Sequence, residues 1–302
     1  MKSSIDRPGH KKAPAQKRLC KSVALFVCLC VFGSFALTGC AGGATSSGTD
    51  SSGSASSGSA EKPELRVAME LAYPPFETKD DAGNPDGISV GFIQAFGEAY
   101  GYDVIIENTA WEGLIPSLQS GKVDCIISSM TITEERKEVV AFSDPYAQAQ
   151  LAILANVDSG IASADDLNQE GKTVVVKTGS TGDVFATKNL SNATIIRLAD
   201  ESACVTEVIQ GKADGFLYDQ LTIFRNQIAN PDNTAAIYIP FQDAEYWGVA
   251  VQKDNEALLA ELNEFIAASK TDGTFDRLTE TFLAEEKEAF DRLGFTWFFD
   301  LA

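Results

Sequence analysis

One nine-residue pattern occurs twice in this chain and constrains its fold more than any other feature. The stretches QSGKVDCII and IQGKADGFL, residues 119–127 and 209–217, each run from the end of an expected helix through Gly-Lys into an expected strand. In both stretches a small apolar residue and an aspartate, Asp124 or Asp214, follow the lysine. A structural unit that recurs in one chain predicts two lobes of similar construction.

Strands and helices alternate along the chain around these two stretches. Apolar runs predict strands at residues 65–69, 103–108 and 123–129 in the first half, and at 173–176 and 215–219 in the second. Amphipathic segments between them predict helices, including one over 89–101 with Ser89 as its N-cap and Gly101 as its end. Strands that alternate with helices in this way are typical of an α/β fold with parallel strand pairing.

The first forty residues have the pattern of an export signal. Seven basic residues lie within residues 1–21, and the apolar run that follows, 22–37, is shorter than the ~20 residues that span a membrane. The stretch LTGC ending at Cys40 resembles a bacterial lipobox, which implies removal of residues 1–39 and a lipid on the Cys40 sulfur. An uncleaved membrane anchor is the alternative. Residues 40–62 have no large apolar side chain and predict a flexible linker.

The charge and the histidine content exclude several classes of function. The chain has 24 Lys and Arg residues and 43 Asp and Glu residues; seven of the basic residues and one of the acids precede Cys40. The chain after Cys40 therefore has 17 basic and 42 acidic residues and a formal net charge of −25. Nucleic acid and anionic lipid are polyanions and are therefore not expected as partners. The only histidine, His10, lies in the signal, which excludes a Ser-His triad and a His-ligated metal from the exported part. We expect no cofactor and no metal. We expect Cys125 and Cys204 to be free buried thiols, and a disulfide between them in the exported protein is the alternative.

From about Leu65 to Leu283 the chain resembles the polar amino-acid family of the extracellular solute-binding proteins that serve ABC transporters. The resemblance rests on the order and spacing of five stretches behind the lipobox: YPPFE (73–77), WEGLIPSLQSGKVDCIISSMTITEERKEVVAFSDPYA (111–147), VVVKTGST (174–181), IQGKADGFLYD (209–219) and KTDGTFDRL (270–278).

The resemblance implies a two-lobed clamshell of the periplasmic-binding-protein type. Each lobe would be a mostly parallel sheet flanked by helices, and two extended crossovers near Leu151–Ala155 and Tyr246–Val251 would form the hinge. Lobe 1 would consist of residues 63–151 and 248–302, and lobe 2 of residues 152–247. One ligand would bind in the cleft between the lobes.

A free amino acid has a carboxylate and an ammonium about three atoms apart, so its recognition needs a cation, an anion and several neutral donors. The guanidinium of Arg136 can bond both carboxylate oxygens at once, and the resemblance assigns it this role. The resemblance also implies Ser128, Ser129 and Thr131 as donors, Ser180 and Thr181 at the start of a helix that favours an anion, and Asp219 as partner of the ammonium. The alternatives are a solvated helix residue for Arg136 and a helix cap for Asp219.

The ligand's side chain would lie between Tyr73 and Trp111, which are expected as aromatic walls. Glu70 occupies a position where several family members carry an acid that faces this side chain, and it favours a cationic ligand. Lys177 occupies a position where glutamine-binding members can carry a lysine. Together these two residues fit the amide of glutamine, or they pair with each other. Glutamine and the basic amino acids, such as arginine and lysine, are therefore equal candidates, with cystine and the acidic amino acids behind them.

The sequence thus predicts a lipoprotein on the outer face of the cell membrane, or in the periplasm, that captures a polar amino acid without chemistry. It would act as a monomer, anchored to the membrane through Cys40, and deliver the ligand to a permease with its ATPase. The alternatives are an enzyme on the same fold, resembling cyclohexadienyl or arogenate dehydratases, a ligand-sensing module, and a binding protein for another solute. The C-terminal tail, 285–302, is expected to pack on the first lobe or to contact a partner.

Overall fold

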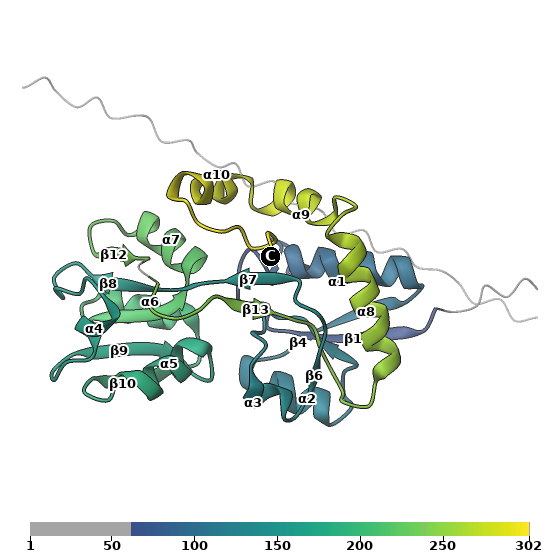
Figure 1. Cartoon of the computed structure of the whole chain (residues 1–302), viewed down its shortest axis with the longest axis horizontal. Coiled ribbons are helices and arrows are strands. Elements are labelled where there is room, and N and C mark those ends of the chain that lie inside the picture. The colour runs from purple at the N-terminus through teal and green to yellow at the C-terminus, as the bar shows by residue number, and fades with distance from the viewer. Residues whose placement is uncertain (1–61, 239, 302) are drawn as a thin grey trace, which may run out of the picture. The chain divides into compact units, whose positions relative to one another are not determined.

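The computed structural model describes residues 62–238 and 240–301 of the chain. The expected signal peptide, the lipid on Cys40 and all but the last residue of the expected linker lie outside these residues. Among the described residues, no helix combines the length and the apolar character that crossing a membrane requires. Two five-stranded sheets, each with its own helices, organise this part of the chain (Figure 1).

The first lobe is built on a sheet with the strand order β4-β1-β5-β14-β6. These strands are β1 (Glu64–Met69), β4 (Asp103–Asn108), β5 (Cys125–Ile126), β6 (Ala141–Phe142) and β14 (Ala250–Val251). A small hairpin of β2 (Thr78–Lys79) and β3 (Pro85–Asp86) precedes the first helix. The helices are α1 (Ile88–Tyr100), η1 (Trp111–Gly113), α2 (Leu114–Gln119), α3 (Glu134–Lys137), α8 (Glu256–Ser269), α9 (Thr274–Phe282) and α10 (Ala284–Leu293).

The second lobe is built on a sheet with the order β10-β9-β11-β8-β12. Its strands are β8 (Leu151–Asn156), β9 (Thr173–Lys177), β10 (Thr194–Leu198), β11 (Gly215–Asp219) and β12 (Thr234–Ile237). Its helices are α4 (Ala164–Leu167), α5 (Thr181–Asn189), α6 (Glu201–Ile209) and α7 (Gln220–Ala229).

The two-lobed α/β fold is confirmed, but the sheets are mixed rather than mostly parallel. In the first sheet β1 pairs in parallel with β4 and β5, whereas β14 pairs antiparallel with β5 and β6. In the second sheet β9 pairs in parallel with β10 and β11, whereas β8 pairs antiparallel with β11 and β12. The antiparallel strands are those next to the crossovers, where the chain enters or leaves a lobe.

Strands of both sheets are buried on both faces, and their alternate residues enter different cores. In β1, Val67 and Met69 pack in the large core of the first lobe, and Ala68 between them packs in a smaller core against α2. In β8, Ile153 and Leu154 likewise enter different cores of the second lobe. This two-residue period places helices on both faces of each sheet, as an α/β layer structure requires.

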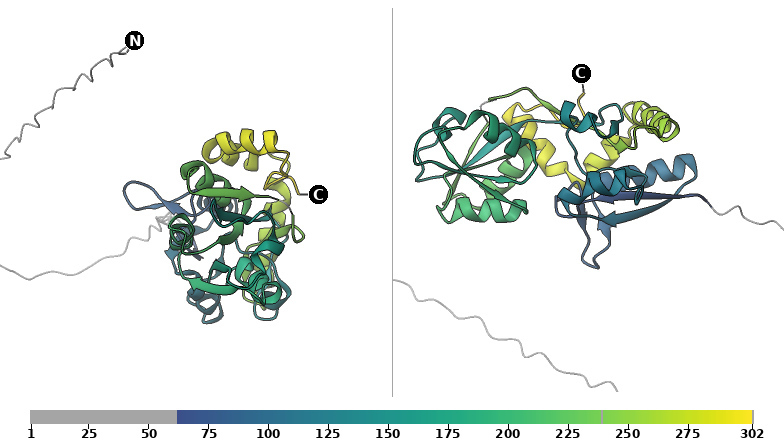
Figure 2. Two further views of the ribbon diagram at one scale, coloured as in Figure 1. Left: turned by 90° about the vertical axis from the view of Figure 1, so that its left-hand side faces the viewer. Right: turned by 90° about the horizontal axis from the view of Figure 1, so that it is seen from below.

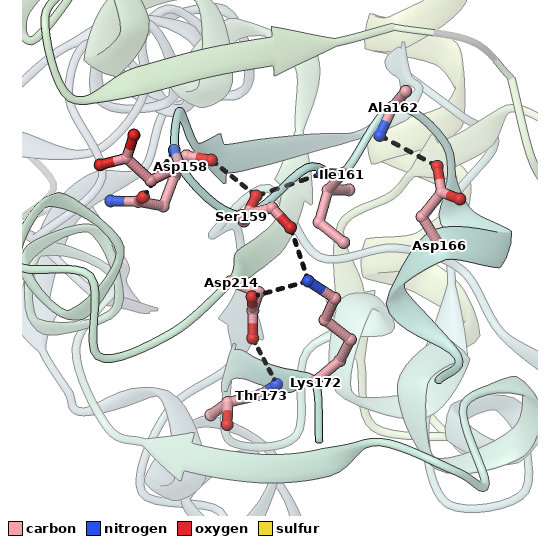
Figure 3. Close-up of polar contacts among 9 residues, drawn as sticks. Asp158, Ser159, Ile161, Ala162, Asp166, Lys172, Thr173 and Asp214 are labelled. Carbon is pink, nitrogen blue, oxygen red and sulfur yellow. Dashed lines mark hydrogen bonds and ion pairs between the residues drawn. The ribbon is translucent and has the colours of Figure 1, made fainter. Parts of the chain in front are cut away.

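The repeated sequence pattern forms the same joint in both lobes. The backbone N–H of Arg66 donates to Oδ2 of Asp124 at 2.7 Å, and the backbone N–H of Thr173 donates to Oδ2 of Asp214 at 2.8 Å. Each aspartate therefore ties the start of one parallel strand to the start of the next. Figure 3 shows the joint of the second lobe, where Lys172 Nζ also donates to Asp214 Oδ1 at 3.1 Å.

The glycine of the pattern explains how the helix gives way to the strand. Gly121 and Gly211 have φ values of 71° and 68°, in the left-handed region that side chains with a Cβ rarely adopt. Such a glycine ends a helix and reverses the chain within one or two residues. The shared sequence pattern thus forms the same helix-to-strand turn in both lobes. The two lobes are similar in construction at these two turns, as the sequence predicted.

The crossovers between the lobes lie a few residues from where the sequence placed them. Leu151–Ala155 is an apolar run that forms most of β8, a buried strand of the second sheet, rather than a crossover. The chain instead passes through β7 (Ala147–Ala149) and returns through β13 (Glu245–Trp247), and these two strands pair antiparallel with each other (Figure 1). The C-terminal part of the expected Tyr246–Val251 crossover belongs to β14 in the first sheet.

The C-terminal segment after α10 packs against the first lobe and the crossovers. Phe298 is fully buried, with ring centroids 5.1 Å from Phe76 and 5.5 Å from Trp247, and its carbonyl accepts from the Gln148 N–H of β7 at 2.8 Å. Figure 2 shows α9 and α10, in yellow, following one another before this segment. The segment also contacts the second lobe, because the ring of Phe295 lies 4.7 Å from that of Tyr238. The expectation that the tail packs on the first lobe is therefore correct but incomplete.

The two cysteines of the described residues are buried and free. Cys125 lies in β5 and Cys204 in α6, in different lobes. Burial raises the pKa of both thiols above the usual value, which keeps them protonated and poorly nucleophilic. The prediction of free buried thiols is confirmed.

Candidate functional site

One cavity is lined by side chains of both lobes and of the crossover strands. The cavity has a volume of about 50 Å³. Its lining consists of Glu70, Tyr73, Trp111, Ser128, Ser129, Thr131, Arg136, Ala149, Leu151, Ser180, Thr181, Tyr218, Asp219, Glu245 and Trp247. Ten of the eleven residues predicted to bind the ligand are among them; Lys177, the eleventh, contacts the lining residue Glu70.

Arg136 brings the positive charge to this cavity from the short helix α3. Thr133 caps this helix, its hydroxyl accepting from the Arg136 N–H at 3.2 Å. The guanidinium donates to the carbonyl of Thr131 at 2.7 Å and, across the two lobes, to the carbonyl of Gly179 at 3.2 Å. These bonds use two of its five N–H donors, so others remain for a ligand. Burial lowers the pKa of Arg136, although an arginine stays charged at neutral pH.

Asp219 brings a negative charge from the end of β11, and its two oxygens have different surroundings. Oδ1 caps α7 by accepting from the N–H groups of Leu221 and Thr222 at 2.9 and 3.0 Å. Oδ2 is buried and has no hydrogen-bond partner among the described residues, while the residue lines the cavity. Asp219 is therefore both a helix cap and a residue of the cavity lining. Burial raises the pKa of this carboxyl, against the opposing effect of the Thr222 and Leu221 N–H groups and of the neighbouring Tyr73 hydroxyl.

The hydroxyls of Ser128 and Ser129 are already engaged with the protein. Ser128 Oγ accepts from the Glu70 N–H at 3.0 Å, and the Ser129 hydroxyl donates to Glu77 Oε1 at 2.9 Å. Ser129 has a φ of 47°, a left-handed conformation that ends the β5 segment earlier than the sequence predicted. These contacts fix the turn that carries both serines, so the turn is rigid before any ligand arrives.

The buried carboxylate of Glu77 holds this turn through hydrogen bonds, and it also explains why Ser89 is not the N-cap that the sequence predicted. Its carboxylate also accepts from the hydroxyl of Ser89, which therefore does not cap α1; Gly87 precedes that helix and provides no side-chain cap. Burial raises the pKa of Glu77 to about 8, against the opposing effect of the two serine donors. Ser89 was expected to bond a backbone N–H of its own helix, but its hydroxyl bonds the side chain of Glu77 instead.

At one end of the cavity, Glu70 and Lys177 form a buried ion pair between the lobes. The pair joins Glu70, directly after β1, to Lys177, the last residue of β9, whose side chain is 3% exposed. Trp111 lies against both cations of the site, with its ring centroid 5.5 Å from Lys177 Nζ and 5.2 Å from Arg136 Cζ. The predicted pairing of Glu70 with Lys177 is the arrangement that the structure adopts.

Tyr73 forms part of an aromatic wall, as the sequence predicted. Its ring packs edge-on against Tyr218 from the second lobe and Trp247 from β13, with centroid distances of 5.9 and 6.2 Å. Burial raises the pKa of Tyr73, which keeps its hydroxyl protonated at all ordinary pH values. The wall therefore carries no charge, and the Tyr73 hydroxyl lies beside Asp219.

The N-terminus of α5 carries Ser180 and Thr181, and the structure gives them different tasks. Ser180 is the N-cap, its hydroxyl accepting from the Asp183 N–H at 3.2 Å. The Thr181 hydroxyl instead donates to Oε2 of Glu245 on β13 at 2.7 Å. Thr131 from the first lobe donates to the same oxygen at 3.0 Å.

Five lining residues were not predicted from the sequence: Ala149, Leu151, Tyr218, Glu245 and Trp247. Most of them lie on or next to the crossover strands β7 and β13, whose pairing no local pattern announces. Tyr218 could have been found, because it directly precedes Asp219 at the end of a predicted strand. Glu245 could not, because it is one of many acids in a very acidic chain.

Taken together, these groups can hold a small molecule that carries both charges. A guanidinium and an unpaired carboxylate oxygen come from different lobes, neutral hydroxyls lie between them, and aromatic rings form the wall. Among the described residues, no histidine accompanies them. The arrangement is suited to recognition of a zwitterion by charge and hydrogen bonding.

Comparison with known proteins agrees with this geometry. Residues 65–285 match the family described as bacterial extracellular solute-binding proteins, family 3. A probable histidine-binding protein of Neisseria gonorrhoeae is 31% identical over 225 residues, which cover 73% of this chain and 83% of that protein. The similarity therefore extends over most of both chains.

Solved structures show the same fold. The structure of an ancestral arginine-binding protein bound to arginine has 33% sequence identity to this chain and a TM-score of 0.68, and it covers 74% of this chain and 99% of that one. The structure of an ancestral arginine-binding protein bound to glutamine has 34% identity and a TM-score of 0.67, with the same coverage. An ancestral amino acid-binding protein, a precursor of cyclohexadienyl dehydratase, has 34% identity and a TM-score of 0.67, covering 72% and 94%. The chain described here belongs to family 3 of the bacterial extracellular solute-binding proteins.

Proposed function

We propose that this protein is the solute-binding component of an ABC importer, and that it captures a polar α-amino acid and delivers it to a membrane permease. Relatives of this chain are named for binding histidine, arginine, glutamine or cystine. Each of these ligands has the same α-carboxylate and α-ammonium, and they differ only in the side chain. The site of this protein supports the common part of that recognition.

The observation that carries the proposal is the position of Arg136 and Asp219 on one cavity. Arg136 comes from α3 of the first lobe, and the unpartnered Oδ2 of Asp219 comes from β11 of the second. A zwitterion that bonds both groups at once favours the arrangement in which the lobes are close together. Ligand binding therefore shifts the protein toward the closed form, which the permease would recognise.

The side chain of the ligand would meet Glu70 and Lys177. An amide can donate to the carboxylate and accept from the ammonium, so glutamine fits the ion pair as it stands. A guanidinium or ammonium would need Glu70 to turn from Lys177 toward the ligand, with Trp111 offering its ring face to the cation. We propose glutamine or a basic amino acid, such as arginine or lysine, as the ligand.

Titration calorimetry and thermal unfolding of the purified protein with each of the twenty amino acids, ornithine and cystine test the proposal. A micromolar ligand corresponds to about 8 kcal/mol of binding free energy. At a hundred times its Kd it stabilises the fold by about 2.7 kcal/mol, which is a measurable rise in Tm. Arg136→Ala should lose the response. A full response in Arg136→Ala, or none to any amino acid in the parent, would refute the proposal.

Four finer statements belong to the same proposal. The protein would be a monomer without enzymatic activity. Lobe 1 would consist of residues 63–150 and 248–302 and lobe 2 of residues 151–247, because Leu151, expected as the last residue before the boundary, begins β8 of the second sheet. Cleavage after residue 39 and a lipid on Cys40 would hold it at the outer face of the membrane. Cys40→Ala should move the protein from the membrane to the soluble fraction. Incubation with prephenate and arogenate should give no dehydrated product; turnover would instead favour an enzyme on this fold.

A further inference from the structure

Glu245 places a carboxylate of the protein inside the cavity, at the junction of the two lobes. It lies on the crossover strand β13 and lines the cavity beside Arg136. Its Oε2 accepts from the Thr131 hydroxyl of the first lobe at 3.0 Å and from the Thr181 hydroxyl of the second at 2.7 Å. Its Oε1 accepts from Gln242 Nε2 at 2.6 Å.

The two hydroxyls that Glu245 holds are those that the ligand carboxylate would need. Thr131 and Thr181 line the cavity together with Arg136, and a carboxylate bound at this guanidinium would lie within their reach. A threonine hydroxyl has one hydrogen to donate. It cannot serve the carboxylate of Glu245 and that of a ligand with full strength at the same time. Two carboxylates at one site also repel each other.

The charges nearby do not remove this conflict. Arg136 donates to the carbonyls of Thr131 and Gly179. Its charge also attracts that of Glu245, so a ligand carboxylate would share this guanidinium with Glu245. The other cation of the site, Lys177, is paired with Glu70. Glu245 therefore depends on the two threonines and Gln242 for its hydrogen bonds, and a ligand carboxylate would take two of the three.

We propose that Glu245 is an internal competitor of the ligand carboxylate, and that it sets the affinity of the site by holding Thr131 and Thr181. This inference rests on the proposed function. The ligand carboxylate displaces Glu245 from the two hydroxyls when it binds Arg136. Removing the Glu245 carboxylate frees both donors and lifts the repulsion, so the ligand binds more tightly. A residue that merely positioned the threonines would have the opposite effect.

The experiment is titration calorimetry of the full chain with arginine and with glutamine, on the parent, Glu245→Ala and Glu245→Gln. Glu245→Ala should bind at least ~10-fold more tightly than the parent, because two hydrogen bonds to a charged group are no longer contested. Glu245→Gln should gain less, because it removes the repulsion but keeps an amide oxygen that can accept from the two threonines. Glu170→Gln is the matched control, since it removes the same charge from an exposed loop position, and it should bind as the parent does. Thermal unfolding confirms that each variant is folded.

A second set of variants tests the role of the hydroxyls. In a chain that carries both Thr131→Val and Thr181→Val, Glu245→Ala should bring no further gain, since no donor is left to release. A gain of similar size in that background would overturn the competition for hydroxyls. Unchanged or weaker binding in Glu245→Ala, with the parent binding normally, would overturn the whole inference and leave the proposed function intact. Absence of binding in the parent and in every variant would overturn the proposed function itself.

Discussion

Asp219 offers the sharpest test of the site, because its two oxygens can be separated by substitution. Oδ1 caps α7 through two backbone N–H groups, whereas Oδ2 is buried without a hydrogen-bond partner among the described residues, in a side chain that lines the cavity. Asparagine keeps a capping oxygen and is as good an N-cap as aspartate. It replaces the cavity oxygen with an NH₂ group, which cannot accept from an ammonium. Asp219→Asn should therefore spare the fold and remove the contact with the ligand.

The expected size of the effect follows from the burial of the site. Removing one partner of a buried, hydrogen-bonded charge pair costs about 2–5 kcal/mol, which is roughly a 30- to 5,000-fold rise in Kd. The unliganded stability should stay equal or rise slightly, because burial disfavours the charged form and raises the pKa of Asp219. Asp219→Ala should lose ligand affinity as well, and also about 0.5–2 kcal/mol of stability through the lost cap.

Calorimetry with glutamine and arginine, together with urea unfolding, measures both quantities on the three proteins. Asp219→Asn with parental affinity would show that Oδ2 does not meet the ligand and that Asp219 is only a cap. Equal loss of stability in the asparagine and alanine variants would show that the capping geometry does not tolerate the amide, and the affinity data would then carry no information about Oδ2.

Three further predictions follow. Phe298→Ala should lower the free energy of unfolding by about 3–5 kcal/mol, because the ring is fully buried in the core of the first lobe. Urea unfolding measures this loss, with Leu293→Ala as the control at an exposed position. A loss below about 1 kcal/mol would mean that the C-terminal tail is not part of that core. Burial raises the pKa of Glu201 from 4.5 to about 8, so the folded protein keeps a proton that the unfolded chain releases. This group alone lowers stability by about 1.4 kcal/mol per pH unit between about pH 5 and 8, and Glu77 adds a similar slope. Urea unfolding of Glu201→Gln across this range should show a correspondingly flatter profile, whereas an unchanged profile would contradict the raised pKa. Lys177→Met should leave Glu70 unpaired, so that its carboxylate can bind a cationic ligand side chain, and should raise the ratio of arginine affinity to glutamine affinity at least ~10-fold. Calorimetry measures both affinities. An unchanged ratio would show that the Glu70–Lys177 pair does not determine specificity.

The features that sequence alone could provide are those encoded by neighbouring residues. Arg136 and Asp219 lie at the start of a short helix and at the end of a strand, and their positions in the fold follow from local patterns together with the family resemblance. The repeated Gly-Lys-x-Asp turns are likewise local, and both adopt the same joint. Ten of the eleven predicted residues consequently line one cavity.

The features that the sequence did not reveal depend on contacts between distant segments. Glu245 enters the cavity because β13 pairs with β7, almost a hundred residues earlier in the chain. Ser89 looked like a helix cap, yet its hydroxyl bonds Glu77 across the turn that precedes the helix. Apolar residues of Leu151–Ala155 were compatible with a crossover and with a buried strand, and only the pairing partners of β8 decide between them.

The position of β14 in the first sheet has a consequence for the order in which the two lobes can be completed. All five strands of the second sheet come from one uninterrupted stretch, residues 151–237. In the first sheet, β14 lies between β5 and β6 and pairs with both, although it follows them by more than a hundred residues. A polypeptide that emerges N-terminus first therefore finishes the later lobe before the earlier one, and until residue 251 arrives β6 lacks its neighbour in the sheet.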